Sequence, residues 1–163
     1  MTQAEHFMQE ILDQEKELQF PRFSNEDAMT IGLDLYETAK KNRLPVSIDI
    51  TRGRQQLFHA VLPGANPDND LWIQRKNNVV RHFEHSSLYI FNELESEGKT
   101  IEERYCFDPG EFGAYGGSFP IIIKDTGVIG TIAVSGLSQN EDHMLVINAI
   151  RRFLSKKTFR SDM

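Results

Sequence analysis

Three histidines are the side chains in this sequence best suited to holding a metal or haem iron, because a neutral imidazole nitrogen is a good ligand for both. His82 and His85 are three residues apart in a stretch with helical periodicity, so their rings would lie on adjacent turns. His143 follows Glu141 and Asp142 at the predicted start of the last helix. Two interpretations stay open: haem-ligand candidates, or solvated helix residues whose neighbouring acids serve the helix dipole.

Basic side chains in two segments could bind an anion, since guanidinium groups match the geometry of carboxylates and phosphates. Arg75 and Lys76 lie near the start of a long predicted helix, and Arg81 follows further along it. Arg52 and Arg54 flank a predicted turn. The same cations could instead pair with the 24 acidic residues of this chain or with those of a neighbouring subunit.

A glycine-rich loop at residues 113–118 could present backbone N–H groups to a phosphate or carboxylate. No Gly-Lys-Ser/Thr follows it, and it leads into a strand rather than a helix, which excludes a Walker loop and a dinucleotide fingerprint. Nearby aromatic residues could line a pocket or a subunit interface; they are Trp72, Phe112, Tyr115 and Phe119. The predicted ligand-binding residues are Arg75, Lys76, Gly116, Gly117, Ser118, Asp142 and His143.

Residues for nucleophilic catalysis are not evident. Ser135 lacks the Gly-x-Ser-x-Gly context of a nucleophile elbow, and no Ser-His-Asp set can be argued from spacing. Cys106 stands between Tyr105 and Phe107, which favours a small buried apolar residue over a reactive thiol. The sequence therefore leans towards binding rather than catalysis.

The elements that must position these residues follow from hydrophobic periodicity and turn signals. Val46, Ile48 and Ile50 alternate with polar residues, as in a half-buried strand. Residues 57–62 would return as its hairpin partner, and Asp-Thr-Gly at 125–127 joins a second pair of strands at 119–124 and 128–135. Helices are predicted at 4–18, 24–42, 71–94, 101–105 and 138–154. Because hairpins pair antiparallel, this order favours an antiparallel sheet covered by helices.

Composition limits the class of protein. The 163 residues suit one domain spanning 1–163, with an N-terminal helical extension at about 1–20 and a polar, frayed tail at about 156–163. A net charge of −6 argues against a nucleic-acid partner. No apolar run approaches the roughly 20 residues that span a bilayer, and the start does not resemble a signal peptide. With one cysteine, no intrachain disulfide is possible, so we expect a cytoplasmic protein without a membrane partner.

The segment GGSFPIIIKDTGVIGTIAVSGLSQNEDHMLV at 116–146 resembles the GlcG-like or haem-degrading-domain superfamily. The helix carrying Trp72, Arg75 and Lys76, together with Ser86 and Ser87, resembles its uncharacterised protein family 0303 branch. One residue more than the superfamily pattern separates the glycine pair from the Pro-Ile dipeptide here. The resemblance implies an α/β protein of the α+β type. Its fold would be a profilin-like three-layer α/β/α sandwich around a mostly antiparallel sheet of about five strands, commonly assembled into symmetric oligomers.

Three functional hypotheses remain. The first is a small-ligand-binding module in a homo-oligomer, whose ligand is anionic or, as the resemblance implies, tetrapyrrole-like. The second is a haem-binding or haem-degrading enzyme with a histidine at the iron, haem being implied by the resemblance alone. The third is a structural or adaptor oligomer without a small ligand.

Overall fold

The two predicted hairpins share one sheet in the computed structural model, which describes residues 1–161. The helices are α1 (Gln3–Glu17), α2 (Asn25–Lys41), α3 (Pro67–Phe83), α4 (Ser87–Glu97), α5 (Ile101–Tyr105) and α6 (Gln139–Ser161). The strands are β1 (Gln19–Phe20), β2 (Ser47–Arg52), β3 (Gln55–Val61), β4 (Ser118–Ile123) and β5 (Gly127–Ser135). This confirms the predicted α+β class.

The sheet has the order β1-β4-β5-β2-β3. Strands β2 and β5 pair antiparallel, with Ser47 opposite Ser135 and Asp49 opposite Ala133, so they join the two hairpins in the middle of the sheet. The two-residue strand β1 pairs parallel with β4 and makes the sheet mixed. Periodicity cannot reveal so short a strand, and the sequence did not predict it.

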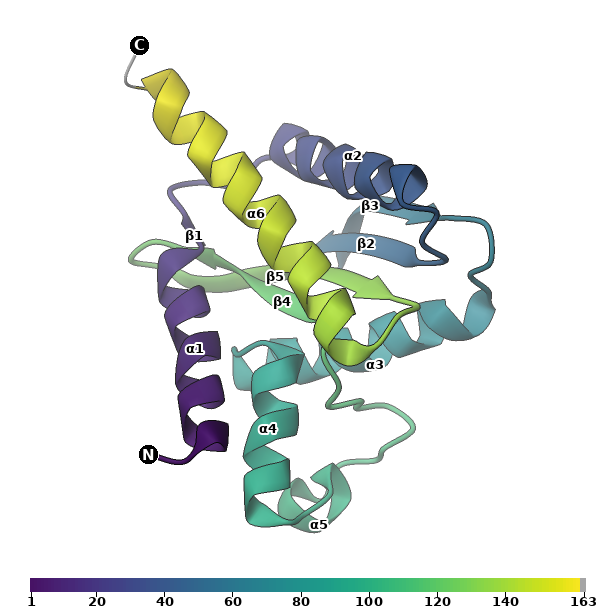
Figure 1. Cartoon of the computed structure of the whole chain (residues 1–163), viewed down its shortest axis with the longest axis vertical. Helices are drawn as coiled ribbons and strands as arrows, with labels where there is room; N and C mark the ends of the chain where they lie inside the picture. Colours follow the sequence, from purple (N-terminus) through teal and green to yellow (C-terminus); the bar gives the residue numbers. More distant parts are fainter. Residues whose placement is uncertain (162–163) are drawn as a thin grey trace.

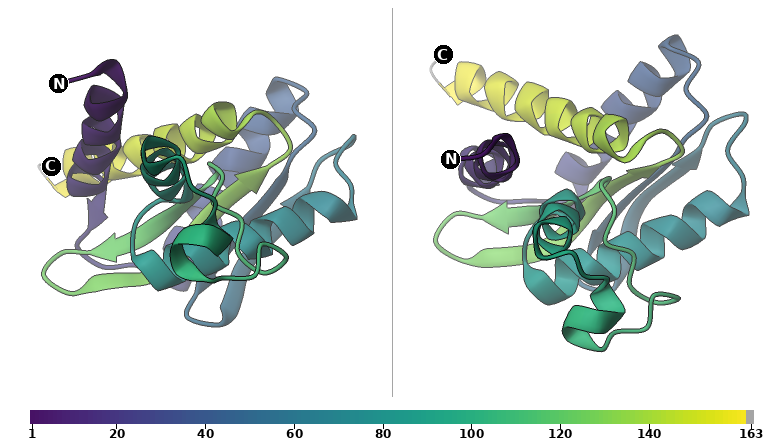
Figure 2. Two further views of the ribbon diagram at one scale, coloured as in Figure 1. Left: turned by 90° about the horizontal axis from the view of Figure 1, so that it is seen from below. Right: turned by 60° about the horizontal axis from the view of Figure 1, so that its bottom comes forward.

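Helices cover both faces of the sheet and produce the expected three layers. Helices α2 and α6 pack on one face and α3 on the other (Figures 1 and 2). Helix α1 stands beside α4 at the β1 end of the molecule (Figure 1). The layers therefore enclose two different interfaces, one beneath α2 and α6 and one beneath α3.

The face beneath α2 and α6 is apolar, and the face beneath α3 is polar. Ile48 and Ile50 of β2 belong to the main hydrophobic core, where they meet α2 and α6. Their neighbours Ser47, Asp49 and Thr51 point the other way and are at most 6% exposed. The prediction of a half-buried strand was wrong, because α3 covers the polar face that the alternation assigned to solvent.

The predicted long helix at 71–94 is two helices. Helix α3 ends at Glu84, whose φ of 58° lies in the left-handed region, and the Ser86 side chain caps the start of α4. Helix α3 also begins earlier than expected, with Asn66 as its N-cap and Pro67 in its first turn. The break turns α4 away from α3, so the residues after 84 do not continue its buried stripe (Figure 1).

The ends of the last helix differ in how well they were predicted. At its start, where the sequence predicted the helix to begin, Ser138 and Glu141 exchange the reciprocal hydrogen bonds of a capping box. At its end, α6 continues to Ser161 through most of the segment expected to be a frayed tail. Residues 162 and 163 of that tail lie outside the described part.

Candidate functional site

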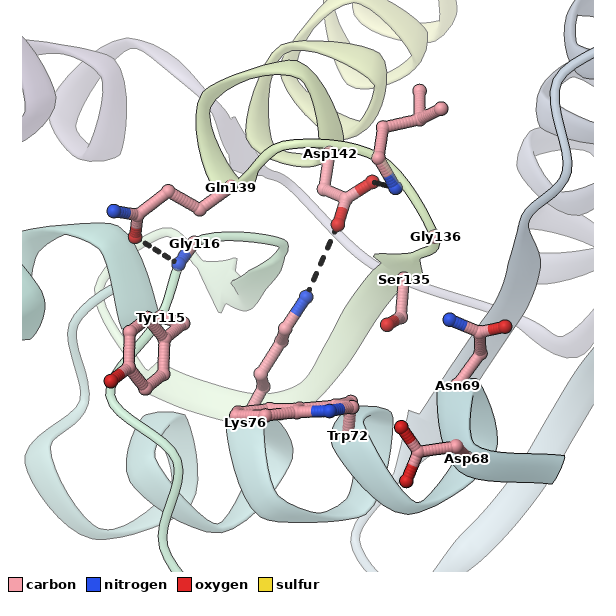
Figure 3. Close-up of a pocket in the computed structure, with 11 residues that line it drawn as sticks. Asp68, Asn69, Trp72, Lys76, Tyr115, Gly116, Ser135, Gly136, Gln139 and Asp142 are labelled. Atoms are coloured by element: carbon pink, nitrogen blue, oxygen red, sulfur yellow. Dashed lines mark hydrogen bonds and ion pairs between the residues drawn. The ribbon is translucent and has the colours of Figure 1, made fainter. Parts of the chain in front are cut away.

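A pocket of about 490 Å³ lies where α3, the glycine-rich loop and the start of α6 meet (Figure 3). Helix α3 contributes Trp72 and Lys76, and the loop contributes Tyr115 and Gly116. Strand β5 ends here, and α6 begins here. The remaining lining residues are Asp68, Asn69, Ser135, Gly136, Leu137, Gln139 and Asp142. The pocket therefore joins three segments that the sequence had marked separately.

Lys76 and Asp142 form a buried ion pair at the floor of this pocket. Lys76 Nζ lies 3.3 Å from Asp142 Oδ2 and 3.3 Å from the Val134 carbonyl oxygen, while its side chain is only 4% exposed. Charge-assisted hydrogen bonds are usually about 2.7–2.9 Å long, so both contacts are loose. An ammonium carries three N–H donors, and the third has no acceptor among the described residues. A donor is thus available at the pocket floor.

Asp142 also fixes the loop before α6, because its Oδ1 accepts the Leu137 N–H at 3.0 Å. Burial raises the pKa of Asp142, against the opposing charge of Lys76 and the hydrogen bonds from Leu137 and Gly136. Burial likewise lowers the pKa of Lys76, against the attraction of Asp142. Desolvation therefore weakens the charged form of each partner, and each depends on the other to stay ionised.

An aromatic pair forms one wall. The rings of Trp72 and Tyr115 meet edge to face with their centroids 5.3 Å apart. Tyr115 is 46% exposed, so its ring is open to solvent at the pocket mouth. Arg75 stacks on Trp72, its Cζ 4.0 Å from the ring centroid, and its Nε donates to the Pro109 carbonyl at 3.0 Å. Arg75 thus braces the wall and the loop from outside and does not line the pocket.

The predicted glycine-loop residues have three different positions. Gly116 lines the pocket, but its N–H already donates to Gln139 Oε1 at 2.9 Å. Gly117 lies behind it with φ of +133°, where an added Cβ would stand 2.6 Å from Lys76 Nζ. Ser118 is fully buried and donates its hydroxyl to Asn77 Oδ1 at 2.7 Å, under α3. Only the first of the three can touch a ligand in this pocket.

None of the three candidate histidines lines this pocket. His143 is 2% exposed and faces α1, with Nε2 2.7 Å from Gln14 Oε1. His85 pairs with Glu15 at 2.8 Å, and His82 packs against Phe107 with ring centroids 4.7 Å apart. The structure therefore separates His143 from Asp142, which adjoins it in sequence.

Electrostatics explain the opposite behaviour of two of these rings. Burial lowers the pKa of His143 from 6.5 to about 4, and the charge of Arg151 adds to the effect. The hydrogen bond that the His85 ring donates to the Glu15 carboxylate raises the pKa of His85. His143 is therefore a neutral core residue at pH 7.

Cys106 is exposed, which corrects the expectation of a buried thiol. It ends α5 in the left-handed region with φ of 58°, and this turn carries its side chain out of the aromatic cluster formed by its neighbours. Within residues 1–161, no group of three or more His, Cys, Asp or Glu side chains could hold a metal ion. Nor does any helix there have the length and apolarity needed to cross a membrane.

Several lining residues were not predicted from the sequence. Asp68, Asn69 and Gln139 are polar residues near helix starts. Helix capping accounts for polar side chains at such positions, so nothing in the sequence indicates that they also line a pocket. Ser135 lacks the sequence context of a nucleophile, yet its position at the end of β5 places it in the lining. No local signal distinguishes these residues from ordinary caps and strand ends.

The fold and the pocket define an α/β/α sandwich with a ligand-sized cleft at the end of its central strands. The chain belongs to the family described as haem degrading protein HbpS-like, whose pattern matches residues 23–151. It is 46% identical over 147 residues to a UPF0303 protein of Streptomyces coelicolor, covering 90% of this chain and 93% of that one. A UPF0303 protein of Paraburkholderia phytofirmans is 42% identical over 145 residues, covering 89% and 88%.

Solved structures share the architecture. The crystal structure of the Ybr137w protein superposes with a TM-score of 0.87 at 31% identity, covering 93% of this chain and 89% of that chain. A PduOC–haem complex superposes with a TM-score of 0.65 at 18% identity, covering 79% and 93%. HbpS itself gives 0.65 at 20% identity, covering 83% and 92%. The last two likenesses concern the fold alone.

Haem can be tested against the pocket residues. A porphyrin needs a flat apolar wall, counter-charges for its carboxylates and, for its iron, an axial ligand such as His, Cys, Met or Tyr. Trp72 and Tyr115 supply a wall and Lys76 one cation, but Tyr115 is the only lining residue of those four ligand types. The lining therefore offers an aromatic wall and one cation, and it offers no histidine to a haem iron.

Proposed function

We propose that this chain is a small-ligand-binding module whose ligand is anionic or tetrapyrrole-like and occupies the pocket between α3, the glycine-rich loop and α6. The observation that carries the proposal is the floor of that pocket, where Lys76 is buried yet keeps a free N–H donor. A ligand carboxylate that accepts this bond would complete the coordination of the ammonium.

The wall of the pocket determines the shape of the ligand. A planar conjugated molecule can lie against Trp72 and Tyr115, since stacked aromatic surfaces attract each other beyond the area that they bury. Asp68 at the rim adds a second carboxylate, so the formal charge of the lining is negative. This favours a ligand with one acidic edge towards Lys76 over a compact polyanion.

The single tryptophan of the chain provides a direct assay, because Trp72 lies in the lining. Hemin, protoporphyrin IX and planar aromatic carboxylates are titrated while Trp72 fluorescence is recorded. We expect saturable quenching by at least one of them. Tyr115→Ser should weaken that binding by about tenfold, the loss of roughly one aromatic contact. Phe7→Ser is the matched control, since Phe7 is a partly exposed ring on α1.

Two outcomes would overturn this proposal. If none of these compounds quenches Trp72, or if Tyr115→Ser binds as tightly as the parent, the pocket is not the site. A Soret band that disappears on His→Ala exchange at His82, His85 or His143 would favour the alternative, a haem enzyme with a histidine at the iron.

We also propose that the module works as a homo-oligomer in the cytoplasm. Strand β3 is an edge of the sheet, and Val61 on it is 46% exposed. Met29 and Leu33 on the adjoining helix α2 are similarly exposed. A second copy could pair along this edge and bury these side chains. Light scattering that shows a monomer at micromolar concentration would refute the oligomer.

A further inference from the structure

A second cleft, of about 330 Å³, lies on the opposite flank of α3, between this helix and the β2–β3 hairpin. It shares no lining residue with the first pocket. Its lining is almost entirely polar or charged, and Ile73 is the only aliphatic residue in it. The cleft therefore suits a small hydrophilic molecule.

The charges in this cleft are separated along its length. On α3, Asp70 is eleven residues before Arg81, which corresponds to about 16 Å along the helix axis. The opposite wall has the same polarity: His59 stands opposite Asp49 in the hairpin, and Arg54 lies at the hairpin turn. One end is thus acidic and the other basic.

The acidic end contains carboxylates that no cation fully neutralises. Asp49 is 4% exposed, and its oxygens accept hydrogen bonds from the side chains of Gln56 at 2.6 Å, Thr51 at 2.8 Å and Asn77 at 3.3 Å. All three donors are neutral.

His59 stands between the two acids of this end. Its Nδ1 is 3.8 Å from Asp49 Oδ1, and its Nε2 is 3.4 Å from Asp70 Oδ1. That Asp70 oxygen is buried and accepts no hydrogen bond from the described residues. The Asp70 side chain as a whole is 37% exposed, so a donor on a ligand would reach this carboxylate through its other oxygen.

The basic end contains cations without carboxylate partners. Neither Arg54 nor Arg81 has an Asp or Glu oxygen within 4.0 Å in the described part of the chain, although Arg81 donates to Asn78 Oδ1 at 3.2 Å. Two negative and two positive side chains line one cleft without forming an ion pair between them. A ligand that carries both charges could satisfy both ends.

We propose that this cleft binds an elongated zwitterion, such as an ω-amino acid or a basic amino acid. Its ammonium would lie against Asp49 and Asp70, and its carboxylate or phosphate against Arg54 and Arg81. A molecule with only one charge would satisfy only one end and leave the other unpaired. The proposal concerns a site separate from the first pocket and does not depend on the function proposed there.

The test measures binding by calorimetry and by the shift of the melting temperature, since a ligand that prefers the native state stabilises it. The zwitterionic probes are 4-aminobutanoate, 6-aminohexanoate, 8-aminooctanoate and lysine. The controls with one kind of charge are 1,6-diaminohexane and adipate, which match 6-aminohexanoate in length. We expect at least one zwitterion to bind and both controls to bind at least tenfold more weakly.

Two substitutions locate the site. Asp70→Asn and Arg81→Gln should each weaken binding of the zwitterion by at least tenfold, because each removes one charge-assisted contact. Arg104→Gln, which removes an exposed cation on α5, should leave it unchanged. Tyr115→Ser should also leave it unchanged, so failure of the first pocket is distinguishable from failure of this one. Equal binding of the controls, no binding of any zwitterion, or unaltered binding by Arg81→Gln would overturn the proposal.

Discussion

Replacing Lys76 by Met should destabilise the fold strongly, because it removes the cation that compensates the buried Asp142 carboxylate, whether Asp142 then stays charged or takes up a proton. Asp142 is 2% exposed, and Lys76 is the only cation within 4.0 Å of it in the described part of the chain. Breaking a buried ion pair from one side costs about 3–5 kcal/mol. Two hydrogen bonds from backbone N–H groups, at Leu137 and Gly136, still support the Asp142 carboxylate. We therefore expect the lower end, about 3 kcal/mol.

Urea denaturation measures this loss, and a thermal scan should show a fall of roughly 9 °C for a domain of this size. Lys99→Met is the matched control, since Lys99 is exposed and its exchange should change the free energy of unfolding by less than about 0.5 kcal/mol. The double variant Lys76→Met with Asp142→Asn should recover at least about 1 kcal/mol, because Asn is neutral and still accepts the Leu137 N–H. A single variant as stable as the control, or a double variant no better than the single, would refute the pairing.

Two further predictions concern His143, which follows Asp142 on α6, and Gly117, which lies against Lys76. Because the pKa of His143 is about 4 in the folded chain and 6.5 when unfolded, the unfolded state binds more protons between these values, and stability falls as pH falls from 6.5 to 4. The pH-dependent loss of stability from this group amounts to about 3 kcal/mol. The variant His143→Gln should lack this loss. Parallel stability–pH curves for the two proteins would contradict the prediction. Gly117→Ala should cost more than about 2 kcal/mol, because φ is +133° and the added Cβ would stand 2.4 Å from the Val134 carbonyl oxygen. Gly53→Ala, with φ of +60° and open space, should cost only about 1 kcal/mol; equal losses measured in urea would show that the crowding does not matter.

The main elements were predictable because each has a local signal. Ser24 begins α2 as expected, and the Asp-Thr-Gly turn joins β4 to β5. The break between α3 and α4 was not predicted, because the residue with the left-handed backbone there is Glu84 rather than glycine or asparagine, the residue types that usually indicate such a conformation. Ser86 was the available clue, since a serine that ends one helix stripe can cap the next helix.

The candidate site was predicted in part, for a geometric reason. Successive residues of an α-helix are turned by about 100°, so neighbours in sequence face different surroundings. Asp142 therefore faces the pocket while His143 faces α1, although the sequence grouped them as one acidic helix start. Lys76 and Arg75 separate in the same way on α3. Residue types in the sequence therefore predicted the segments that form the pocket. Which residues of those segments line the pocket depends on the rotation of each helix.

The acidic end of the second cleft was not predicted, because the polar face of β2 resembles a solvated face; Arg54 and Arg81 of its lining were named only as anion-binding candidates. Its Asp49 reaches Asn77 of α3, a partner 28 residues away, and no local pattern contains that separation. On α3, Lys76 and Asn77 are consecutive, and they reach Asp142 on one flank and Asp49 on the other. Because a buried polar group must keep its hydrogen bonds, these two contacts together hold α3 in one register on the sheet. A slip of one residue would break both at once, so the helix that separates the two clefts also fixes the shape of each.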